Sequence, residues 1–361
     1  MVDAWIDGEH ATLEAAASEA AKLLRVCRLP LIAGLGTDVA GARAAIELAA
    51  QIGGVTDHMH SEPLLRDLDV AREAGMMVIT RIEAALVADT VLMVGPGVEP
   101  AWPELRRELV DRRMGLPSNQ KRSRILRLCP EIPARERREE ERWVGTHRRE
   151  LPGLLAALRA ILAGRPIAKL RERTRIEEVA AALRQARFGV ALWSAAELDV
   201  LTIEMLCGLV EELNRNTRFS GLPSIAADQA AAVLEVCGWL TGFPMRTGFG
   251  RGFPEHDPWR FSASRLVKSG EADCALWISA YRAAAPEWDD DVLIVALTGV
   301  EAKFRRPPRV HIAVGKPGVD HDAVEQFAAT GTLARTEAKH KSDAIPVADA
   351  VHAIASVLAK H

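Results

Sequence analysis

The chain of 361 residues lacks the features that mark membrane, secreted and cysteine-rich metal proteins. It has no run of about 18 apolar residues, so no segment is predicted to span a bilayer. Its first residues, MVDAWIDGEH, show no basic region followed by an apolar one, so no secretory signal is expected. The five cysteines form no CxxC pair, which argues against structural zinc and iron–sulfur clusters. We therefore expect a cytoplasmic protein with reduced thiols.

A large excess of one charge is also missing. The net charge is -3, which gives no reason to expect a nucleic-acid or membrane partner. The charge is uneven, however, because residues 106–149 hold 14 Lys or Arg against 7 Asp or Glu. We predict that this basic segment contacts an acidic partner surface or a polyanion through Arg135, Arg137, Arg138, Arg142, Arg148 and Arg149. The alternative is a solvated helix with ion pairs between residues four apart.

Short apolar runs alternate with longer segments whose apolar residues recur at helical spacing. This alternation favours parallel sheets covered by helices on both faces. The expected strands cover residues 29–36, 88–97, 123–130, 187–196, 271–280, 290–297 and 308–315. We predict two Rossmann-like, doubly wound α/β domains with mainly parallel sheets. The first is residues 1–163 joined by the C-terminal segment 318–361, the second is residues 176–317, and the polar stretch 164–175 is the linker.

One glycine-rich turn raises the question of nucleotide binding. The stretch GLGTDVAG (34–41) follows an expected strand and opens an expected helix. It is one residue longer than the GxGxxG fingerprint of dinucleotide-binding folds, and Asp57 stands in the range of the acid that binds the ribose. The alternative is a tight strand-to-helix turn, which needs glycine for steric reasons alone.

Several stretches, taken in order, resemble one known family. LPLIAGLGTDVAGARAAIELAAQIGGVTD (29–57), ADTVLMVGPGVEPAWP (88–103) and VCGWLTGFPMRTGFGRGFPEHDPWRFSASRLVKSGEADCALWISA (236–280) are similar to the B-type subunit of formylmethanofuran dehydrogenase, a relative of the molybdopterin oxidoreductases. The resemblance implies a truncated molybdopterin-oxidoreductase scaffold, because the sequence offers no second glycine-rich loop and no domain of the kind that grips the pterin.

The family's metal-binding position departs from its pattern here. In the dehydrogenases a cysteine or selenocysteine that binds molybdenum or tungsten is followed by histidine, glycine and proline. Aligned on Pro63, this chain has His60 in the place of the thiolate and Ser61 in the place of the histidine. Imidazole lacks the charge and softness of a thiolate, so the resemblance implies a vestigial site without cofactor. Arg251 matches an arginine near the family's substrate, and is either a remnant of the site or a loop arginine.

Two catalytic alternatives stay open at this position. His58 and His60 have the HxH spacing of zinc amidohydrolases, in which alternate strand residues point the same way. A zinc hydrolase would need further ligands, and no other histidines show matching spacing. An active molybdenum or tungsten dehydrogenase is the other alternative. The plain interpretation is two histidines on a turn after a buried strand.

Within the family, the chain looks most like the cofactor-free B-type subunit of the formyltransferase/hydrolase complex of methylotrophic bacteria. This resemblance implies a non-catalytic scaffold subunit in the oxidation of formaldehyde to formate, linked to tetrahydromethanopterin and methanofuran. The implied partners are a formyltransferase subunit, a zinc-containing amidohydrolase-like subunit and a subunit related to the C-type subunit of the dehydrogenase. A methanofuran-like carrier is also implied for the complex, and no cofactor for this chain.

Overall fold

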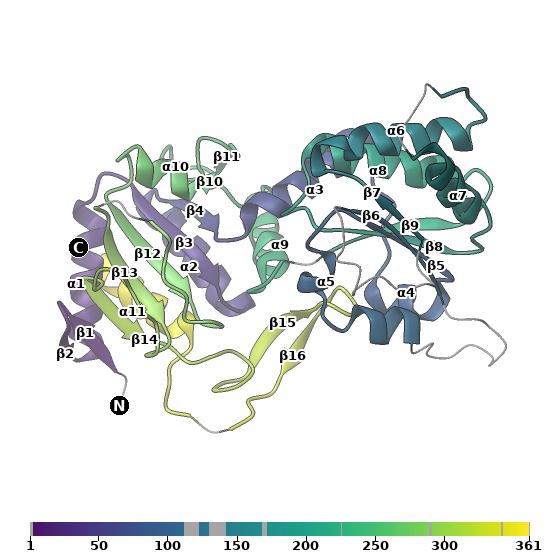
Figure 1. Cartoon of the computed structure of the whole chain (residues 1–361). Helices are drawn as coiled ribbons and strands as arrows, with labels where there is room; N and C mark the ends of the chain where they lie inside the picture. Colours follow the sequence, from purple (N-terminus) through teal and green to yellow (C-terminus); the bar gives the residue numbers. More distant parts are fainter. Residues whose placement is uncertain are drawn as a thin grey trace. The chain divides into compact units, whose positions relative to one another are not determined.

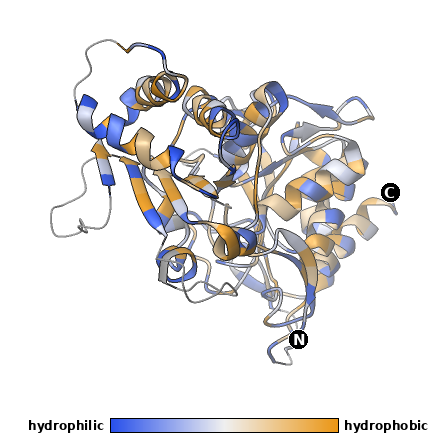
Figure 2. Ribbon diagram, turned by 90° about the vertical axis from the view of Figure 1, so that its right-hand side faces the viewer, coloured by the Kyte–Doolittle hydropathy of each residue, from blue (hydrophilic) through white to orange (hydrophobic). Residues whose placement is uncertain are grey.

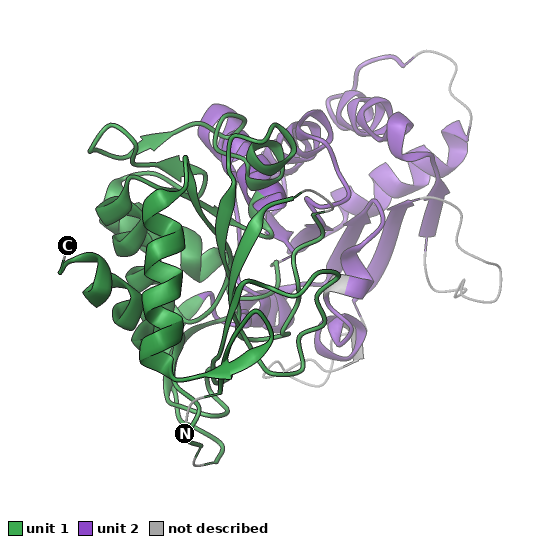
Figure 3. Cartoon of the chain, turned by 90° about the vertical axis from the view of Figure 1, so that its left-hand side faces the viewer, with its two compact units in different colours: residues 1–61, 226–327, 332–361 green, residues 62–225, 328–331 purple. Residues whose placement is uncertain are grey.

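The computed structural model describes residues 3–111, 123–129, 142–167, 172–224, 226–288, 291–340 and 342–360, and Figure 1 shows its elements. The chain divides into two compact units, which Figure 3 draws in different colours. Unit 1 consists of residues 1–61, 226–327 and 332–361, and unit 2 of residues 62–225 and 328–331. None of the described helices is long and apolar enough to cross a membrane.

Unit 1 is built on a nine-stranded sheet with the order β11-β10-β4-β3-β12-β13-β14-β1-β2. The five strands from β4 to β14 in this order are parallel, and the others pair antiparallel at the two edges. Every residue of β3 and β12 is buried, as expected of parallel strands covered on both faces. The strands are β1 (Ala4–Ile6), β2 (Glu9–Ala11), β3 (Pro30–Gly36), β4 (Val55–His58), β10 (Thr247–Gly248), β11 (Glu255–His256), β12 (Cys274–Ser279), β13 (Leu293–Thr298) and β14 (Val310–Ala313).

Helices cover both faces of this sheet. Alternate strand residues such as Ile32 and Leu276 pack against α1 (Leu13–Val26), α2 (Val39–Ile52), α9 (Ala230–Thr241) and α11 (Val347–Leu358). Leu31 and Trp277 belong to the opposite face, with α10 (Ala263–Lys268). The helices show polar and apolar stretches along their ribbons in Figure 2. A hairpin of β15 (Ala323–Phe327) and β16 (Thr332–Thr336) completes the unit.

Unit 2 contains a five-stranded, wholly parallel sheet with the order β7-β6-β5-β8-β9. Its strands are β5 (Thr90–Val94), β6 (Arg124–Cys129), β7 (Arg142–Gly145), β8 (Gly189–Trp193) and β9 (Phe219–Pro223). One face packs against α3 (Ser61–Ala74), α6 (Leu151–Leu162), α7 (Arg173–Arg184) and α8 (Val200–Leu213), next to the 3-10 turn η3 (Arg148–Glu150). The other packs against α4 (Arg81–Val87), α5 (Val98–Ala101) and the π-helical turn η1 (Arg106–Asp111). The predicted fold class is therefore confirmed.

The compact units divide the chain differently from the predicted domains. Residues 62–163 share unit 2 with β8 and β9, and residues 226–317 share unit 1 with the N-terminal residues. The reason is strand pairing, since β12 lies between β3 and β13 while β5 lies between β6 and β8. The predicted linker 164–175 falls inside unit 2, and its residues 168–171 are outside the described part. The C-terminal helix α11 packs on α1 and α2 in unit 1.

Candidate functional site at the carboxyl end of β4

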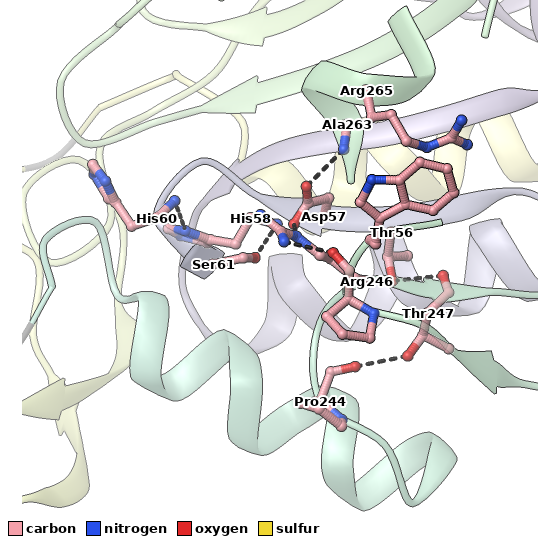
Figure 4. A network of polar contacts seen from close by, with 12 residues as sticks. Thr56, Asp57, His58, His60, Ser61, Pro244, Arg246, Thr247, Ala263 and Arg265 are labelled. Carbon is pink, nitrogen blue, oxygen red and sulfur yellow. Dashed lines mark hydrogen bonds and ion pairs between the residues drawn. The ribbon is translucent and has the colours of Figure 1, made fainter. Parts of the chain in front are cut away.

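The segment around His58 lies at the carboxyl edge of the unit 1 sheet. Because β3, β4 and β12 run parallel, Gly36, His58 and Ser279 end their strands at the same edge. Ligand sites of open α/β sheets form at such edges. Figure 4 shows that the residues of β4 make hydrogen bonds on several sides. The edge is therefore the place in unit 1 where the fold can assemble a site from distant parts of the sequence.

His58 is a buried, neutral imidazole with both ring nitrogens engaged. Its Nδ1 accepts a hydrogen bond from the backbone N–H of His60 at 2.9 Å, and its Nε2 lies 3.1 Å from the carbonyl oxygen of Asp228. This pattern requires the proton on Nε2. Burial lowers the pKa of His58 to about 4. The backbone N–H of His58 donates to Ser61 Oγ at 3.0 Å. The turn after β4 is thus held by its own side chains.

His60 belongs to an ion-pair network with Asp228 and Arg282. Its Nε2 is 2.9 Å from Asp228 Oδ2 and 2.8 Å from Nη2 of Arg282. One ring nitrogen cannot donate to the carboxylate and accept from the guanidinium at once, and the carboxylate is the stronger partner. Arg282 also binds Asp228 through Nε at 2.9 Å and through Nη2. The carboxylate of Asp228 thus contacts both His60 and the guanidinium of Arg282.

Asp228 is the centre of this network and is held in an unusual backbone conformation. Its side chain is only 2% exposed, whereas that of Arg282 is 54% exposed. Burial alone would raise the pKa of Asp228, but hydrogen bonds from His60 and Arg282 outweigh it and keep the pKa below its ordinary value. Asp228 and Gln229 have φ values of 56° and 61°, a left-handed conformation that is strained for both. Gln229 is fixed by hydrogen bonds with the backbone of Gln326.

The donors at this site do not fit the heavy-metal pterin of the dehydrogenases. The position that the resemblance assigns to the thiolate holds His60, whose imidazole is hydrogen-bonded to Asp228, and the guanidinium of Arg282 already supplies a cation beside it. A second cation would be repelled there. No cluster of three or more His, Cys, Asp or Glu that could hold a metal was found among the described residues. The hydrogen bonds among these groups hold the turn after β4 against the segment before α9 and against the end of β12.

The other predicted site residues lie apart from this network or support it structurally. Ser61 accepts the hydrogen bond from His58 and is buried at the start of α3. Arg251 is 63% exposed in the connection between β10 and β11, where its Nη1 is 3.2 Å from Glu255. The arginine that reaches His60 is Arg282 instead. Asp57 is buried and accepts a hydrogen bond from the N–H of Ala263 at 2.8 Å.

The glycine-rich turn after β3 is explained by close packing. A Cβ on Gly34, which has a φ of +79°, would lie 2.5 Å from the carbonyl oxygen of Ile278 in β12. The N-terminus of α2 is capped by its own acid, since Asp38 Oδ1 accepts from the N–H of Gly41 at 3.0 Å. A carboxylate in this position occupies the place where a phosphate would bind a helix N-terminus. The turn therefore gives no support to nucleotide binding.

The basic segment is only partly described, because Arg135, Arg137 and Arg138 lie outside the described residues. Arg142 donates to the carbonyl oxygen of Glu178 at 3.4 Å, and Nη1 of Arg148 is 3.3 Å from Glu197. Arg149 lines a pocket of about 550 Å³ together with Trp143, His147, Glu150 and Glu172. Two glutamates in the pocket reduce its attraction for a polyanion. The described arginines thus make surface contacts within unit 2.

Asp228 and Arg282 are the site residues that sequence reasoning missed. They are 168 and 222 positions from His60, so no local spacing connects them. Arg282 could have been found, because it follows a predicted strand and the carboxyl ends of parallel strands meet at one edge. For Asp228 the sequence offers no comparable pattern.

Known proteins with similar sequences place the chain in a family. No family model matches the sequence. The B-type subunit of the formyltransferase/hydrolase complex Fhc of Methylorubrum extorquens is 32% identical over 319 residues, which cover 87% of this chain and 85% of that protein. The chain belongs to the family of Fhc B-type subunits. A chain in the crystal structure of the formyltransferase/hydrolase complex (FhcABCD) from Methylorubrum extorquens in complex with methylofuran matches it with a TM-score of 0.87 and 31% identity, over 99% of each chain.

The family is also related to the metal-containing dehydrogenases, as the sequence suggested. The B-type subunit of tungsten-containing formylmethanofuran dehydrogenase 2 of Methanocaldococcus jannaschii is 26% identical over 287 residues. These residues cover 76% of this chain but 65% of the dehydrogenase protein. The predicted resemblance is therefore confirmed both to the Fhc B-type subunit and to the dehydrogenase B-type subunit. It is stronger to the Fhc protein than to the dehydrogenase.

Proposed function

We propose that this chain is a non-catalytic, structural subunit of a formyltransferase/hydrolase complex that takes part in the oxidation of formaldehyde to formate. The observation that carries the proposal is the state of the position inherited from the dehydrogenases. The resemblance places His60 where the dehydrogenases have the thiolate, and the structure places Asp228 and Arg282 beside His60. A network in which the carboxylate is paired with the guanidinium and hydrogen-bonded to the imidazole stabilises a fold and leaves no free ligand for a redox metal.

The network has a structural task that suits this role. The chain leaves unit 1 after Ser61 and returns to it at residue 226, and His60 and Asp228 stand within three residues of these two points. Their contact at 2.9 Å therefore fixes both ends of the insertion that forms unit 2. Fixing the ends of a long insertion removes conformational entropy that would otherwise oppose ordering.

The partners follow from the family membership and are part of the proposal. We expect a formyltransferase subunit, an amidohydrolase-like subunit that holds zinc, and a subunit related to the C-type subunit of the dehydrogenase. The carrier would be a methanofuran-like molecule, and the site of action the cytoplasm. The M. extorquens complex in the related crystal structure was solved with methylofuran, which supports a carrier of this class.

The basic segment is proposed to contact an acidic neighbour, either a partner subunit or the carboxylates of the carrier. Arg142, Arg148 and Arg149 would take part, together with Arg135, Arg137 and Arg138. Reversing the charge of Arg137 and Arg138 should weaken association, and more strongly at low salt, because exposed charges are screened. Unchanged co-purification of the R137E/R138E variant at low salt would contradict this contact.

The structural role is tested in the assembled complex. Co-expression with the partner subunits should yield a stable complex in which this chain contains no stoichiometric molybdenum or tungsten, measured by elemental analysis. His60→Ala and Arg282→Ala should leave the rates of formyl transfer and hydrolysis within about twofold of wild type in fully assembled complexes. They should lower the melting temperature, because Asp228 loses a partner.

A different outcome would refute the proposal. If either variant lowered kcat strongly while the complex stayed fully assembled, the network would belong to an active site. Stoichiometric tungsten or molybdenum in the wild-type chain would restore the dehydrogenase alternative, and zinc lost on changing His58 or His60 would restore the hydrolase alternative.

A further inference from the structure

Two of the five cysteines meet in unit 1, although they are far apart in the sequence. Cys27 is the C-cap residue of α1, and Cys274 is the first residue of β12. Cys274 lies in the hydrophobic cluster between α1 and the sheet, and Cys27 packs against the same cluster. Their thiols are hydrogen-bonded to each other. All five cysteines are free thiols in the structure, so this pair is in the reduced state.

The residues next to the two cysteines hold their backbones together. The backbone N–H of Arg28 donates to Asp273 Oδ1 at 3.0 Å, and Nε of Arg28 donates to Asp273 Oδ2 at 3.2 Å. The register of β3 and β12 sets Cys274 opposite Pro30, which is three residues after Cys27. The approach of the two segments therefore does not depend on the thiols, and it keeps both sulfur atoms within reach of each other.

The two thiols differ in access and in acidity. Cys27 is partly exposed and follows Val26, which is 73% exposed, whereas Cys274 is only 1% exposed. The thiol of Cys27 donates to the carbonyl oxygen of Leu24 at 3.2 Å. The hydrogen bond from Cys274 lowers the pKa of Cys27, and the same contact together with burial raises the pKa of Cys274. A reagent from solvent therefore meets Cys27 first, and Cys27 is the thiol that ionises more readily.

We propose that Cys27 and Cys274 form an oxidisable dithiol whose oxidant is a low-molecular-weight disulfide of the glutathione type, written RSSR. The thiolate of Cys27 attacks one sulfur of RSSR, which forms a mixed disulfide and releases RS⁻. The sulfur of Cys274 then loses its proton and attacks Sγ of Cys27, which forms the Cys27–Cys274 bond and releases the second RS⁻. The two cysteines lose two electrons, RSSR gains them, and the two thiol protons go to the two RS⁻.

The bond would tie the end of α1 to the start of β12, at the edge of the sheet opposite to the network of His60. It would close residues 28–273 into a loop, and closing a long loop restricts the unfolded chain more than the folded one. The oxidised chain should therefore melt about 5 °C or more above the reduced chain. A lower melting temperature after oxidation would contradict a bond that fits the native fold. The dithiol is independent of the proposed function, because it needs unit 1 alone.

The experiment treats the folded full chain with oxidised glutathione, alkylates the remaining thiols and digests the chain with trypsin without reduction. The wild type should lose two of its five thiols. Mass spectrometry should find the tryptic peptides 26–28 and 269–282 joined by a disulfide, since each of them contains one cysteine of the pair. Reduced glutathione in excess should restore both thiols, because exchange is reversible.

Two controls separate the pair from ordinary thiols. Cys207 is also partly exposed, but burial raises its pKa to about 11, so it should react at least about tenfold more slowly than Cys27. Cys274→Ala should stop at a mixed disulfide on Cys27, and circular dichroism checks that this variant folds. If it does not fold, the peptide map of the wild type decides alone. A wild type in which Cys27 reacts no faster than Cys207, keeps glutathione on Cys27 or links other cysteines would overturn the proposal.

Discussion

Unit 1 fills the space beneath its helices with alanine, whereas unit 2 fills it with leucine. In unit 1 the buried residues of α1 and α2 include Ala16, Ala20, Ala45 and Ala49. In unit 2 the buried residues of α6 and α8 include Leu155, Leu158, Leu206 and Leu209. Both cores are closely packed, but large side chains carry more of the burial in unit 2. The two units therefore build similar layers of helices and parallel strands from side chains of different volume. Truncating a buried side chain should lower the stability of unit 2 more than that of unit 1.

The two units also bury ionisable groups with opposite effects. In unit 1, burial keeps His58 neutral by lowering its pKa to about 4. In unit 2, burial raises the pKa of Asp67 to about 6, even though Asp67 Oδ1 accepts a hydrogen bond from Nε1 of Trp193 at 2.8 Å. Lowering the pH should therefore destabilise unit 1, because protonation of His58 favours the unfolded state. It should stabilise unit 2, because protonation of Asp67 removes a buried charge.

The largest expected effect comes from removing volume in unit 2. Leu206→Ala should lower the free energy of unfolding by about 2–5 kcal/mol, because the removed atoms are fully buried and leave a cavity. Urea unfolding followed by hydrogen exchange should locate the loss in unit 2. Leu201→Ala is the control on the same helix, since Leu201 is 53% exposed, and it should cost less than about 0.5 kcal/mol. Equal losses for the two variants would contradict the leucine core.

The second effect is the acid sensitivity of unit 1. His58 has a pKa of 6.5 in the unfolded chain and of about 4 in the folded chain. The neutral form of His58 therefore gives its full contribution to the stability of the folded state above pH 6.5, and this contribution is lost as the pH falls towards 4. The loss amounts to about 3 kcal/mol. His58→Gln should make the stability of unit 1 less dependent on pH in this window, measured by amide hydrogen exchange. The same slope in both proteins would show that His58 is not the group responsible.

The third effect has the opposite sign and lies in unit 2. The pKa of Asp67 is raised when the protein folds, so its destabilising contribution is absent below about pH 4 and grows as the pH rises through 6. Asp67→Asn keeps an acceptor for Trp193 and removes the buried charge. It should stabilise unit 2 by about 3 kcal/mol at pH 7 and by much less at pH 4. Thermal melts at the two pH values measure this gain, and a gain of equal size at both would count against the ionised carboxylate as its cause.

The smallest effect compares the helix caps of the two units. Asp38 caps α2 and is buried, whereas Asp199 caps α8 and is exposed, with Oδ1 2.8 Å from the N–H of Thr202. Changing either to alanine should cost about 1 kcal/mol, and somewhat more at Asp38 because water cannot replace the lost acceptor there. Chemical denaturation measures both, and an equal or larger loss at Asp199 would contradict this ranking.

Much of the layering was predictable from the sequence, and the strand partners were not. The run LPLIAGLG predicts β3 and the run EADCALWISA contains β12, because buried parallel strands are continuously apolar. The two lie side by side, although more than 200 residues separate them. Apolarity identifies a strand but does not specify its neighbours. For this reason the predicted boundaries at 163 and 176 fell inside unit 2.

The site was predictable only where it is local in sequence. His58, His60 and Ser61 were identified from one short stretch, and the resemblance to a metal-binding family explained why that stretch matters. The resemblance implies that His60 stands in place of a thiolate, but the contacts of His60 with Asp228 and Arg282 could not be predicted, because those residues come from the segment before α9 and the end of β12. Apart from the strand end that precedes Arg282, no pattern in the sequence indicates that Asp228 and Arg282 lie next to His60.

The contact between His60 and Asp228 has a consequence for protein engineering. His60 and Asp228 flank the insertion that forms most of unit 2, and their side chains touch, with Nε2 and Oδ2 2.9 Å apart. A gene that joins residue 61 to residue 226 through a few glycines would therefore need to bridge only a short gap. Residues 62–225 could therefore be replaced by another inserted domain, with His60 and Asp228 kept on either side of the insertion point.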